Sequence, residues 1–398
     1  MGRIEFMDAN AAIAEAAVVA GLGFYAGYPI TPSSEVPERL SKIMPEKGVP
    51  FMMMEDEIAS INACVGAAAS GVKAMTCTSG PGLSLKQEAF GMACMLEVPL
   101  VVVDVMRGGP STGLPTRPSQ GDVMQARWGT HGDHPVIAVA PCNAQEAVFE
   151  TIRAFNLAEK FRQPVYILTD GSLSHLHTKV YIPDPEEVEV IDRQAPEVEP
   201  DNYYPYDYNY EIPPLAPWWT KDGKSYRYHM SSLIHDKTGF PTVVPKYVQW
   251  LETRMMNKIM NHLDEILKYE YYKMDDAETC IIAFGSTAES ARVAIDEARE
   301  QGIKVGMFRP LTIWPSPEAQ IKDIASKVKN IIVAEMNLGQ YVLEVERIVA
   351  GQVPVYNIAQ ATGTLIRPSQ ILEKIKDPSK KVELIMSEEE IKRFGGGE

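Results

Sequence analysis

The sequence predicts an α/β protein with two α/β domains, each built on a mainly parallel sheet, joined by an irregular middle segment. Short apolar runs alternate with helical stretches over residues 1–180, and the same alternation returns over residues 276–398. The strands, such as LVVVDV at residues 100–105, are apolar throughout instead of alternating with polar residues. Continuous apolar strands separated by helices are typical of a parallel sheet that is covered on both faces.

In the first domain, residues 1–180, the pattern predicts a regular succession of strands and helices. Helices are expected over residues 10–20, from Pro32 onward, and over 57–70, 83–96 and 143–160, with strands over 23–28, 51–54, 73–77, 100–105 and 164–170. Thr31 or Ser33 can cap the helix after Pro32. Residues 107–122, rich in glycine and proline, are expected to form a long functional loop without secondary structure.

The middle segment, residues 181–275, is expected to be an irregular connector and arm that contains one helix near residues 246–268. Residues 203–219 are dense in tyrosine, tryptophan and proline and show no periodicity. Because a disordered linker rarely carries so many aromatic residues, we expect this arm to pack on a protein surface. In the last domain, residues 276–398, strands are expected at 280–285, 303–310, 330–337 and 353–359, with helices between them.

Charge and composition exclude several functional classes. The chain of 398 residues has a formal net charge of −15, which disfavours partners with phosphate backbones or anionic lipid surfaces. It shows no signal-peptide pattern and no long apolar run, so we expect a cytoplasmic protein that binds neither nucleic acid nor membrane. Its five cysteines are scattered without CxxC spacing, so we expect no iron–sulfur cluster or other metal to be held by this chain.

Nucleotide-binding motifs are absent although the fold class invites them. There is neither GxGxxG nor GxxxxGK[ST], and the glycines of residues 21–27 lead into a strand instead of out of one. A phosphate cradle needs its glycines between a strand and the start of a helix. A nicotinamide-dependent dehydrogenase is therefore disfavoured.

Four segments whose side chains could take part in binding or catalysis follow predicted strands, at the edge of the sheet where α/β proteins bind ligands. They are YPITPSS at residues 28–34, EDE at 55–57, TSGPG at 78–82 and the loop at 107–122. A hydroxyl such as that of Thr31 can bind a carboxylate at a helix start, and a carboxylate after a Met-rich strand suits proton exchange with a heterocyclic nitrogen. Arg107 can bind a carboxylate through two hydrogen bonds.

Each of these segments also has an ordinary structural interpretation. Thr31 or Ser33 can be a helix cap, the three acids can interact with a helix dipole, TSGPG can be a tight turn, and the loop can be a solvent loop. The histidines of GTHGDH, residues 129–134, lack the spacing typical of metal ligands and are interpreted as loop or interface residues.

Taken in order, YPITPSS, EDEIASINACVGAAASG, TSGPG, RGGPSTGLPT and QGDVMQARWGTHGDH resemble the α-subunit of 2-oxoacid:ferredoxin oxidoreductases. The resemblance continues in AEMNLGQ and covers most of the chain, and MQARWGTHGDH is most similar to the branch that acts on 2-oxoglutarate. It implies a first domain like the pyrimidine-binding domain of thiamine enzymes and a last domain like the C-terminal domain of transketolase.

The resemblance also implies roles for individual residues. Glu57 would hydrogen-bond the aminopyrimidine ring nitrogen of thiamine diphosphate, with Glu55 as the reserve candidate. Thr31 and Arg107 would bind the 2-oxoacid, and Thr116 would lie beside it. The further residues expected to line the cofactor are Pro29, Ile30, Gly80 and Gly82.

The resemblance implies partners as well, because the diphosphate-and-magnesium motif of thiamine enzymes and the iron–sulfur cysteines are missing from this chain. A β-subunit would hold Mg²⁺ and a [4Fe-4S] cluster, with γ- and δ-subunits as further candidates. Ferredoxin would accept the electrons, and coenzyme A would accept the acyl group of the 2-oxoacid. Two alternatives remain open: the same machinery acting on a branched 2-oxoacid or pyruvate, and a non-catalytic α/β scaffold subunit.

Overall fold

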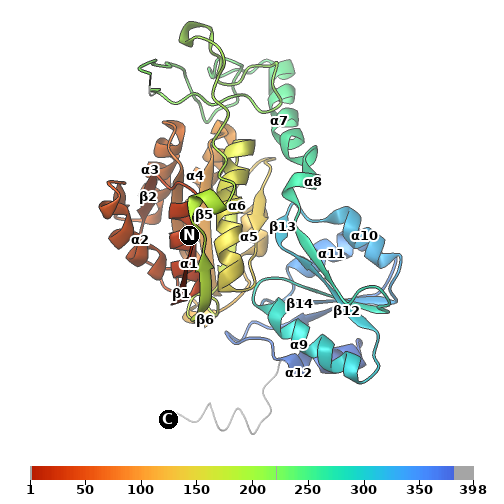
Figure 1. Cartoon of the computed structure of the whole chain (residues 1–398). Coiled ribbons are helices and arrows are strands. Elements are labelled where there is room, and N and C mark those ends of the chain that lie inside the picture. The colour runs from red at the N-terminus through yellow and green to blue at the C-terminus, as the bar shows by residue number, and fades with distance from the viewer. Residues whose placement is uncertain (1, 221, 381–398) are drawn as a thin grey trace, which may run out of the picture.

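The computed structural model describes residues 2–220 and 222–380 and shows two α/β halves with a projecting arm (Figure 1). The first half contains β1 (Arg3–Met7), α1 (Ala9–Val19), β2 (Phe24–Gly27), α2 (Glu35–Glu46), β3 (Phe51–Met53), α3 (Glu57–Ala69), β4 (Ala74–Thr78), α4 (Pro81–Leu96), β5 (Leu100–Gly108), β6 (Leu114–Pro118), α5 (Val123–Trp128), β7 (Ile137–Val139), α6 (Ala144–Phe161), β8 (Pro164–Asp170) and β9 (Thr178–Ile182). Every strand and helix predicted for this half is present, so its fold class is confirmed.

The first sheet has the strand order β13-β7-β8-β5-β4-β2-β3, and every pair among β7, β8, β5, β4, β2 and β3 is parallel. Apolar residues on both sides of each strand account for this arrangement. Along β5, Val101 and Val103 pack into the cluster beneath α1, α2 and α6, whereas Leu100 and Val102 pack into the cluster beneath α3 and α4. The sheet is therefore buried on both faces, as the apolar strands predict.

Two local predictions for the first half were wrong. Residues 107–122 are not a structureless loop, because β5 continues through Arg107 to Gly108 and β6 folds back against it. Neither Thr31 nor Ser33 caps α2: the Ser33 hydroxyl donates to the Ile30 carbonyl at 2.8 Å, and the capping position is taken by Ser34, whose side chain makes no cap. Competition from a local carbonyl explains the second difference.

The middle segment forms the arm seen above the first half in Figure 1, beyond the end of the sheet opposite β6. Over residues 183–268 its regular elements are the short 3₁₀ turns η1 (Pro185–Glu187) and η2 (Pro200–Asn202) and the helices α7 (Pro245–Met260) and α8 (Leu263–Ile266), and residues 269–272 near its end form a strand of the last half's sheet. The one helix predicted near residues 246–268 is thus two, separated by Asn261 and His262. The aromatic arm packs on the first half, as its composition predicts: the buried Tyr206 hydroxyl donates to the Leu96 carbonyl at 3.1 Å.

A buried charge network fixes the arm to the amino ends of the strands. The carboxylate of Glu97 accepts hydrogen bonds from Arg254 and, at 2.9 Å, from the Lys258 ammonium group. The Arg162 guanidinium donates to the carbonyls of Pro205 at 2.9 Å and Pro213 at 2.7 Å. Burial opposes ionisation of Glu97, but the neighbouring cations outweigh it and hold the pKa of this carboxyl well below its usual range. The network replaces regular secondary structure as the anchor of the arm.

The last half has its own sheet, with the order β10-β12-β11-β14-β15, in which only β10 is antiparallel to its neighbour. Its elements are β10 (Tyr269–Tyr272), β11 (Thr279–Ala283), α9 (Thr287–Glu300), β12 (Val305–Pro310), β13 (Thr312–Trp314), α10 (Glu318–Ala325), β14 (Asn330–Glu335), α11 (Tyr341–Val349), β15 (Val355–Ala359) and α12 (Pro368–Lys376). The short strand β13 leaves this half and pairs with β7 at the edge of the first sheet.

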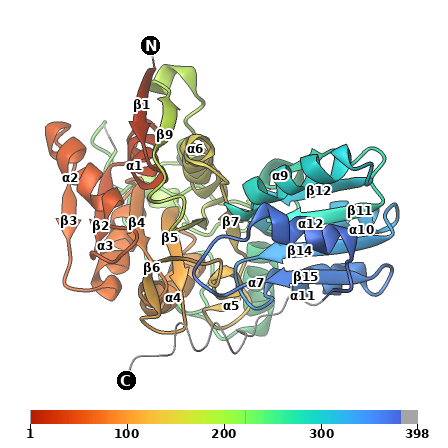
Figure 2. The ribbon, with the colours of Figure 1, turned by 90° about the horizontal axis from the view of Figure 1, so that it is seen from below.

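Gln120 joins the two halves, which lie side by side in Figure 2. Its backbone N–H donates to the Met336 carbonyl at 2.9 Å, and its side-chain amide donates to the Phe284 carbonyl at 2.8 Å. Its amide oxygen accepts from the Thr287 hydroxyl at 2.9 Å, and its backbone carbonyl accepts from the Asn337 amide at 2.7 Å. Gln120 is fully buried, so these bonds are shielded from water.

Among the helices of residues 2–220 and 222–380, none combines the length and the apolar character that crossing a membrane requires.

We predict that Glu97→Gln destabilises the protein by about 3–5 kcal/mol, because it leaves the buried charges of Arg254 and Lys258 without a counter-ion. Urea unfolding followed by tryptophan fluorescence measures this, and limited proteolysis reports whether the arm is released. The control is Glu199→Gln, which removes the exposed ion pair with Lys224 and leaves the unfolding midpoint unchanged. Equal midpoints for Glu97→Gln and the parent protein would show that the network does not anchor the arm.

Candidate active site

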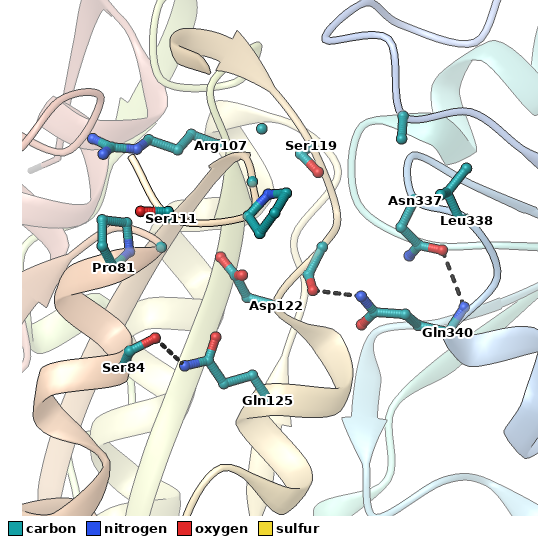
Figure 3. A pocket seen from close by; sticks show the side chains of 16 residues that line it. Pro81, Ser84, Arg107, Ser111, Ser119, Asp122, Gln125, Asn337, Leu338 and Gln340 are labelled. Carbon is teal, nitrogen blue, oxygen red and sulfur yellow. Dashed lines mark hydrogen bonds between the residues drawn. The ribbon is translucent and has the colours of Figure 1, made fainter. Parts of the chain in front are cut away.

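A cavity of about 620 Å³ opens between the two halves at the carboxyl ends of the first sheet's strands (Figure 3). The first half contributes the start of α4, the end of β5 and the segment from β6 to α5. The last half contributes the turn after β14, where Asn337, Leu338 and Gln340 lie. The Gln340 side chain closes one edge by donating to the Gly121 carbonyl at 2.6 Å. The cavity therefore exists only where the two halves meet.

Arg107 lines this cavity from the end of β5. Its Nη1 atom donates to the Thr31 carbonyl at 2.7 Å, so the structure brings these two predicted residues together. Its Nε atom is buried and has no hydrogen-bond partner within the described chain. Burial lowers the pKa of the guanidinium, which nonetheless stays charged near neutral pH. A fixed cation with a free N–H group suits an anionic group such as a carboxylate.

Glu57 is the first residue of α3 and is only 5% exposed. The cap of this helix is made by the neighbouring Asp56, whose carboxylate accepts from the Ala59 N–H at 2.7 Å. Nothing in residues 2–220 and 222–380 donates a hydrogen bond to the carboxylate of Glu57. The ordinary helix-capping interpretation therefore applies to Asp56, and the Glu57 carboxylate is left available to a group from outside this chain.

Two glycines at the start of α4 leave room for the Glu57 carboxylate. A methyl group at Gly82 would lie 2.6 Å from Oε1 of Glu57 and would also collide with the Thr78 hydroxyl. Gly80 has φ +42°, a backbone conformation that other residues rarely adopt. The hydroxyls of Thr78 and Ser79 are buried beside them without a partner in the described residues. The TSGPG segment is thus a turn at which the backbone lies close to the side chains of Glu57 and Thr78.

Asp104 and Asp122 form a pair of carboxyl groups beside this site. Asp104 is fully buried on β5, and neither of its oxygens has a hydrogen-bond partner in the described chain. Asp122 lines the cavity, where Figure 3 shows it below Arg107. Burial raises the pKa of both carboxyl groups, and the proximity of Asp122 raises that of Asp104 further. Burial thus favours the protonated form of both carboxyl groups.

Among the predicted site residues, only Arg107 and Gly80 line this cavity. Glu57, Thr31 and Gly82 lie outside its lining, as do the remaining ones. Pro29 lines a separate hollow of about 260 Å³ with Phe51 and Met53 beside the edge strand β3. Ile30 is half-buried, next to Thr31. Thr116 is exposed on β6 and does not line the cavity, and Glu55 is exposed one residue before the cap of α3.

The histidines of residues 129–134 border a different hollow, of about 470 Å³, together with residues of the arm. The His134 ring contacts the Gly132 carbonyl at 3.0 Å, which agrees with the interpretation as loop and interface residues. Sequence reasoning missed Asp104, Asp122 and Gln120. The sequence does mark Asp104 in one way, because it is the only charged residue in the apolar run LVVVDV. Gln120 and Asp122 gave no signal beyond their place in the long segment.

Two family models match the chain. The first, described as pyruvate flavodoxin/ferredoxin oxidoreductase, thiamine diphosphate binding, matches residues 15–252 and so includes the cavity residues of the first half. The second, pyruvate:ferredoxin oxidoreductase core domain II, matches residues 277–371.

Curated relatives match along almost the whole chain. A 2-oxoglutarate synthase subunit KorA from Methanocaldococcus jannaschii is 44% identical over 370 residues, which are 93% of this chain and 98% of the relative. The corresponding subunit from Archaeoglobus fulgidus is 35% identical over 374 residues, 94% of this chain and 99% of the relative. A ketoisovalerate oxidoreductase subunit VorB from Methanothermobacter thermautotrophicus is 34% identical, covering 94% of this chain and 97% of the relative.

Among solved structures, the chain resembles a 2-oxoglutarate:ferredoxin oxidoreductase from Magnetococcus marinus with 2-oxoglutarate, coenzyme A and succinyl-CoA bound. The TM-score is 0.88 at 33% identity, over 94% of this chain and 65% of the Magnetococcus chain. This chain therefore spans about two thirds of the length of that one. A split-gene transketolase in an inactive β4 tetramer matches with a TM-score of 0.54 at 12% identity, which shows a shared fold alone.

We predict that Asp122→Asn changes how stability depends on pH. A carboxyl group whose pKa is raised by folding stabilises the protein at low pH, and this contribution disappears as pH rises toward the folded pKa. The contribution of Asp122 to stability should therefore be lost between about pH 4 and about pH 6, and the variant should lose about 1–2 kcal/mol less over this range. Thermal unfolding at both pH values measures this. Asp133→Asn, at an exposed aspartate, is the control, and identical pH dependence in all three proteins would contradict a raised pKa of Asp122.

Proposed function

This chain belongs to the pyruvate flavodoxin/ferredoxin oxidoreductase family, and we propose that it is the α-subunit of a thiamine-diphosphate-dependent 2-oxoglutarate:ferredoxin oxidoreductase. In the proposed reaction 2-oxoglutarate loses CO₂, its keto carbon is oxidised to the thioester carbon of succinyl-CoA, and ferredoxin takes up the two electrons. The observation that supports the proposal is the contact of Arg107 with the Thr31 backbone carbonyl, near Glu57, at the carboxyl ends of neighbouring parallel strands. A free carboxylate, a hydroxyl and a guanidinium are the groups that this chemistry needs from the chain.

The similarity of relatives supports 2-oxoglutarate as the substrate. The matches named as subunits of 2-oxoglutarate synthase reach 44% identity, whereas those named as ketoisovalerate oxidoreductase reach 34%. The Magnetococcus enzyme, with 2-oxoglutarate bound, has the same fold over 94% of this chain. A branched 2-oxoacid is the second candidate, since the ketoisovalerate relatives also match along the whole chain.

The residues beside Glu57 fit the aminopyrimidine half of thiamine diphosphate. The Glu57 carboxylate has no partner within the described chain, and the buried hydroxyls of Thr78 and Ser79 are likewise unpaired. Gly82 lets the Glu57 carboxylate and the Thr78 hydroxyl lie close against the start of α4. When bound, thiamine diphosphate supplies a nucleophilic thiazolium carbon and an electron sink for decarboxylation. We assign to Glu57 the hydrogen bond to the pyrimidine ring nitrogen and the proton held between those two atoms.

Arg107 and Thr31 are proposed to bind and orient the substrate. The Arg107 guanidinium is fixed on one side by the Thr31 carbonyl, so its free Nε–H and charge can face the carboxylate of a 2-oxoacid. The Thr31 side chain lies at the same strand end and can donate to a substrate oxygen. Thr116, on the exposed strand β6, stays a prediction as a substrate neighbour, as do Pro29 and Ile30 as cofactor contacts.

We propose that partner subunits complete the site. The relatives are themselves named as subunits, and the Magnetococcus enzyme was solved with coenzyme A bound. The sequence lacks a diphosphate-and-magnesium motif and clustered cysteines, so Mg²⁺ and a [4Fe-4S] cluster are assigned to a β-subunit, with γ- and δ-subunits as further candidates. The chain therefore supplies one side of a shared site. The cytoplasmic location and the domain limits near residues 180 and 275 stay predictions; the two family models leave residues 253–276 between them, which supports the second limit.

The test is purification of the native complex and assay of viologen reduction with coenzyme A and a panel of 2-oxoacids. We expect coenzyme-A-dependent reduction with 2-oxoglutarate, far less with pyruvate or a branched 2-oxoacid, and none from this chain alone. Glu57→Gln should lower the rate by about 100-fold or more, because it removes the proton-exchanging group. Preference for a branched 2-oxoacid would keep the family and overturn the substrate, and a complex inert to every 2-oxoacid would overturn the proposal.

We further predict that Gly82→Ala mimics the loss of Glu57 while the fold persists. The added methyl group occupies the space of Oε1 of Glu57, so the carboxylate must move and thiamine diphosphate affinity should fall about tenfold or more. Calorimetric titration of the assembled complex measures this. Gly66→Ala is the matched control, because Gly66 lies in α3 with no atom within 4 Å of the added methyl group, and it should keep full affinity. Equal affinities for the two variants would contradict the close approach.

A further inference from the structure

Lys86 is a fully buried cation in α4, one turn after Gly82. Its ammonium group donates three hydrogen bonds: to the Glu57 backbone carbonyl at 3.2 Å, to the Ser60 hydroxyl at 2.5 Å and to the Thr76 hydroxyl at 3.0 Å. All three acceptors are neutral, and no carboxylate in the described part of the chain forms an ion pair with it. Lys86 is therefore a buried charge that is hydrogen-bonded but not neutralised.

Burying a charge without a counter-ion is unfavourable, so a structural reason alone would favour an apolar residue at this position. Lys258 provides the comparison within the same molecule. Burial lowers the pKa of Lys86 and of Lys258 to about 8 each, but Lys258 pairs with the Glu97 carboxylate at 2.9 Å in the network that anchors the arm. Lys86 has no such pair among the described residues and lies instead beneath the candidate active site. Charged groups of this kind concentrate at functional sites.

Lys86 and Glu57 meet in the seam between α4 and α3. Residues four apart on a helix share a face, so Gly82 and Lys86 both point from α4 toward α3. The Glu57 carboxylate lies over Gly82, and the Glu57 carbonyl and Ser60 hydroxyl lie one turn further along the same seam, at the ammonium group. One lysine therefore contacts the backbone of the candidate catalytic residue and places a positive charge on the side where its carboxylate lies.

The charged groups around Lys86 leave Glu57 as its main electrostatic neighbour. From α3, Asp56 and Glu57 favour the charged ammonium, while burial raises the pKa of the Cys64 thiol in α3 and the Cys77 thiol in β4 to about 12. Both thiols are neutral at physiological pH. Asp56 is occupied in capping α3.

On the other side, Arg107 is the second cation that faces Glu57. Arg107 borders the cavity, where a substrate carboxylate would neutralise it, whereas Lys86 is enclosed and does not line the cavity.

We infer that Lys86 is a positioning residue that holds the first turn of α3 and places a positive charge beside the Glu57 carboxylate, which shares a proton with the cofactor ring nitrogen. This inference rests on the proposed function of Glu57. Removing the positive charge makes Glu57 more basic. The proton between Glu57 and the ring nitrogen is then retained to higher pH.

The experiment measures the pH dependence of thiamine diphosphate affinity, by calorimetric titration of the assembled complex depleted of cofactor. In Lys86→Met and Lys86→Gln the pH at which affinity declines should rise by about one unit. Glu57→Gln should abolish this pH dependence. Glu88→Gln, which removes an exposed charge from the same helix, should leave it in place. A purely structural role for Lys86 would change affinity without moving the pH profile, and that result would overturn the inference.

Two milder variants keep the test decisive if loss of Lys86 prevents assembly. Ser60→Ala and Thr76→Val each remove one acceptor of the charged ammonium, which lowers its pKa and shifts the profile in the same direction by a smaller amount. An unmoved profile in both variants would overturn the inference. Failure of the unaltered complex to bind thiamine diphosphate would instead overturn the proposed function, so the two failures are distinguishable.

Discussion

The arrangement of the whole site depends on the hydrogen bonds of one buried glutamine. Gln120 uses its backbone and both ends of its side-chain amide to bind four residues of the last half, and all of these bonds are shielded from water. Because they are made between the two halves, they set the distance between the strand ends of the first sheet and the turn after β14. The cavity beside Arg107 is the space that this distance leaves. Gln120 thus helps to hold the groups of the two halves around the same cavity.

Near that cavity, buried positive side chains contrast with the negative net charge of the whole chain. The protein carries a formal net charge of −15, yet Arg107 and Lys86 place two positive charges near Glu57, and burial raises the pKa of the carboxyl groups of Asp104 and Asp122. An acidic surface with a site of this kind can admit an anionic substrate while discouraging nonspecific binding of polyanions.

Much of the fold could be predicted because it depends on local periodicity. Apolar strands such as β5 and β8 are buried on both faces and are recognisable by that property alone, and helices such as α3 and α6 begin at clear caps. The hairpin of β5 and β6 could not be predicted, since its pairing joins residues that are individually typical of a loop. The short strand β13 was equally hidden, because its partner lies in the other half of the chain.

Some residues of the site could likewise be predicted from the sequence, and others could not. Thr31, Glu57 and Arg107 stand in motifs at strand ends and could be identified from the resemblance, while Asp104, Lys86 and Gln120 owe their importance to burial. Burial of a polar side chain depends on residues distant in sequence, such as Met336 for Gln120. A sequence shows such residues only as exceptions within apolar patterns.

The pairing of β13 with β7 has a mechanical consequence. A strand from the last half completes the edge of the first half's sheet, so rotation of one half against the other would have to break backbone hydrogen bonds as well as the contacts of Gln120. The two halves are therefore held together by backbone hydrogen bonds along a shared sheet edge as well as by side chains, and the cavity between them has walls from both halves.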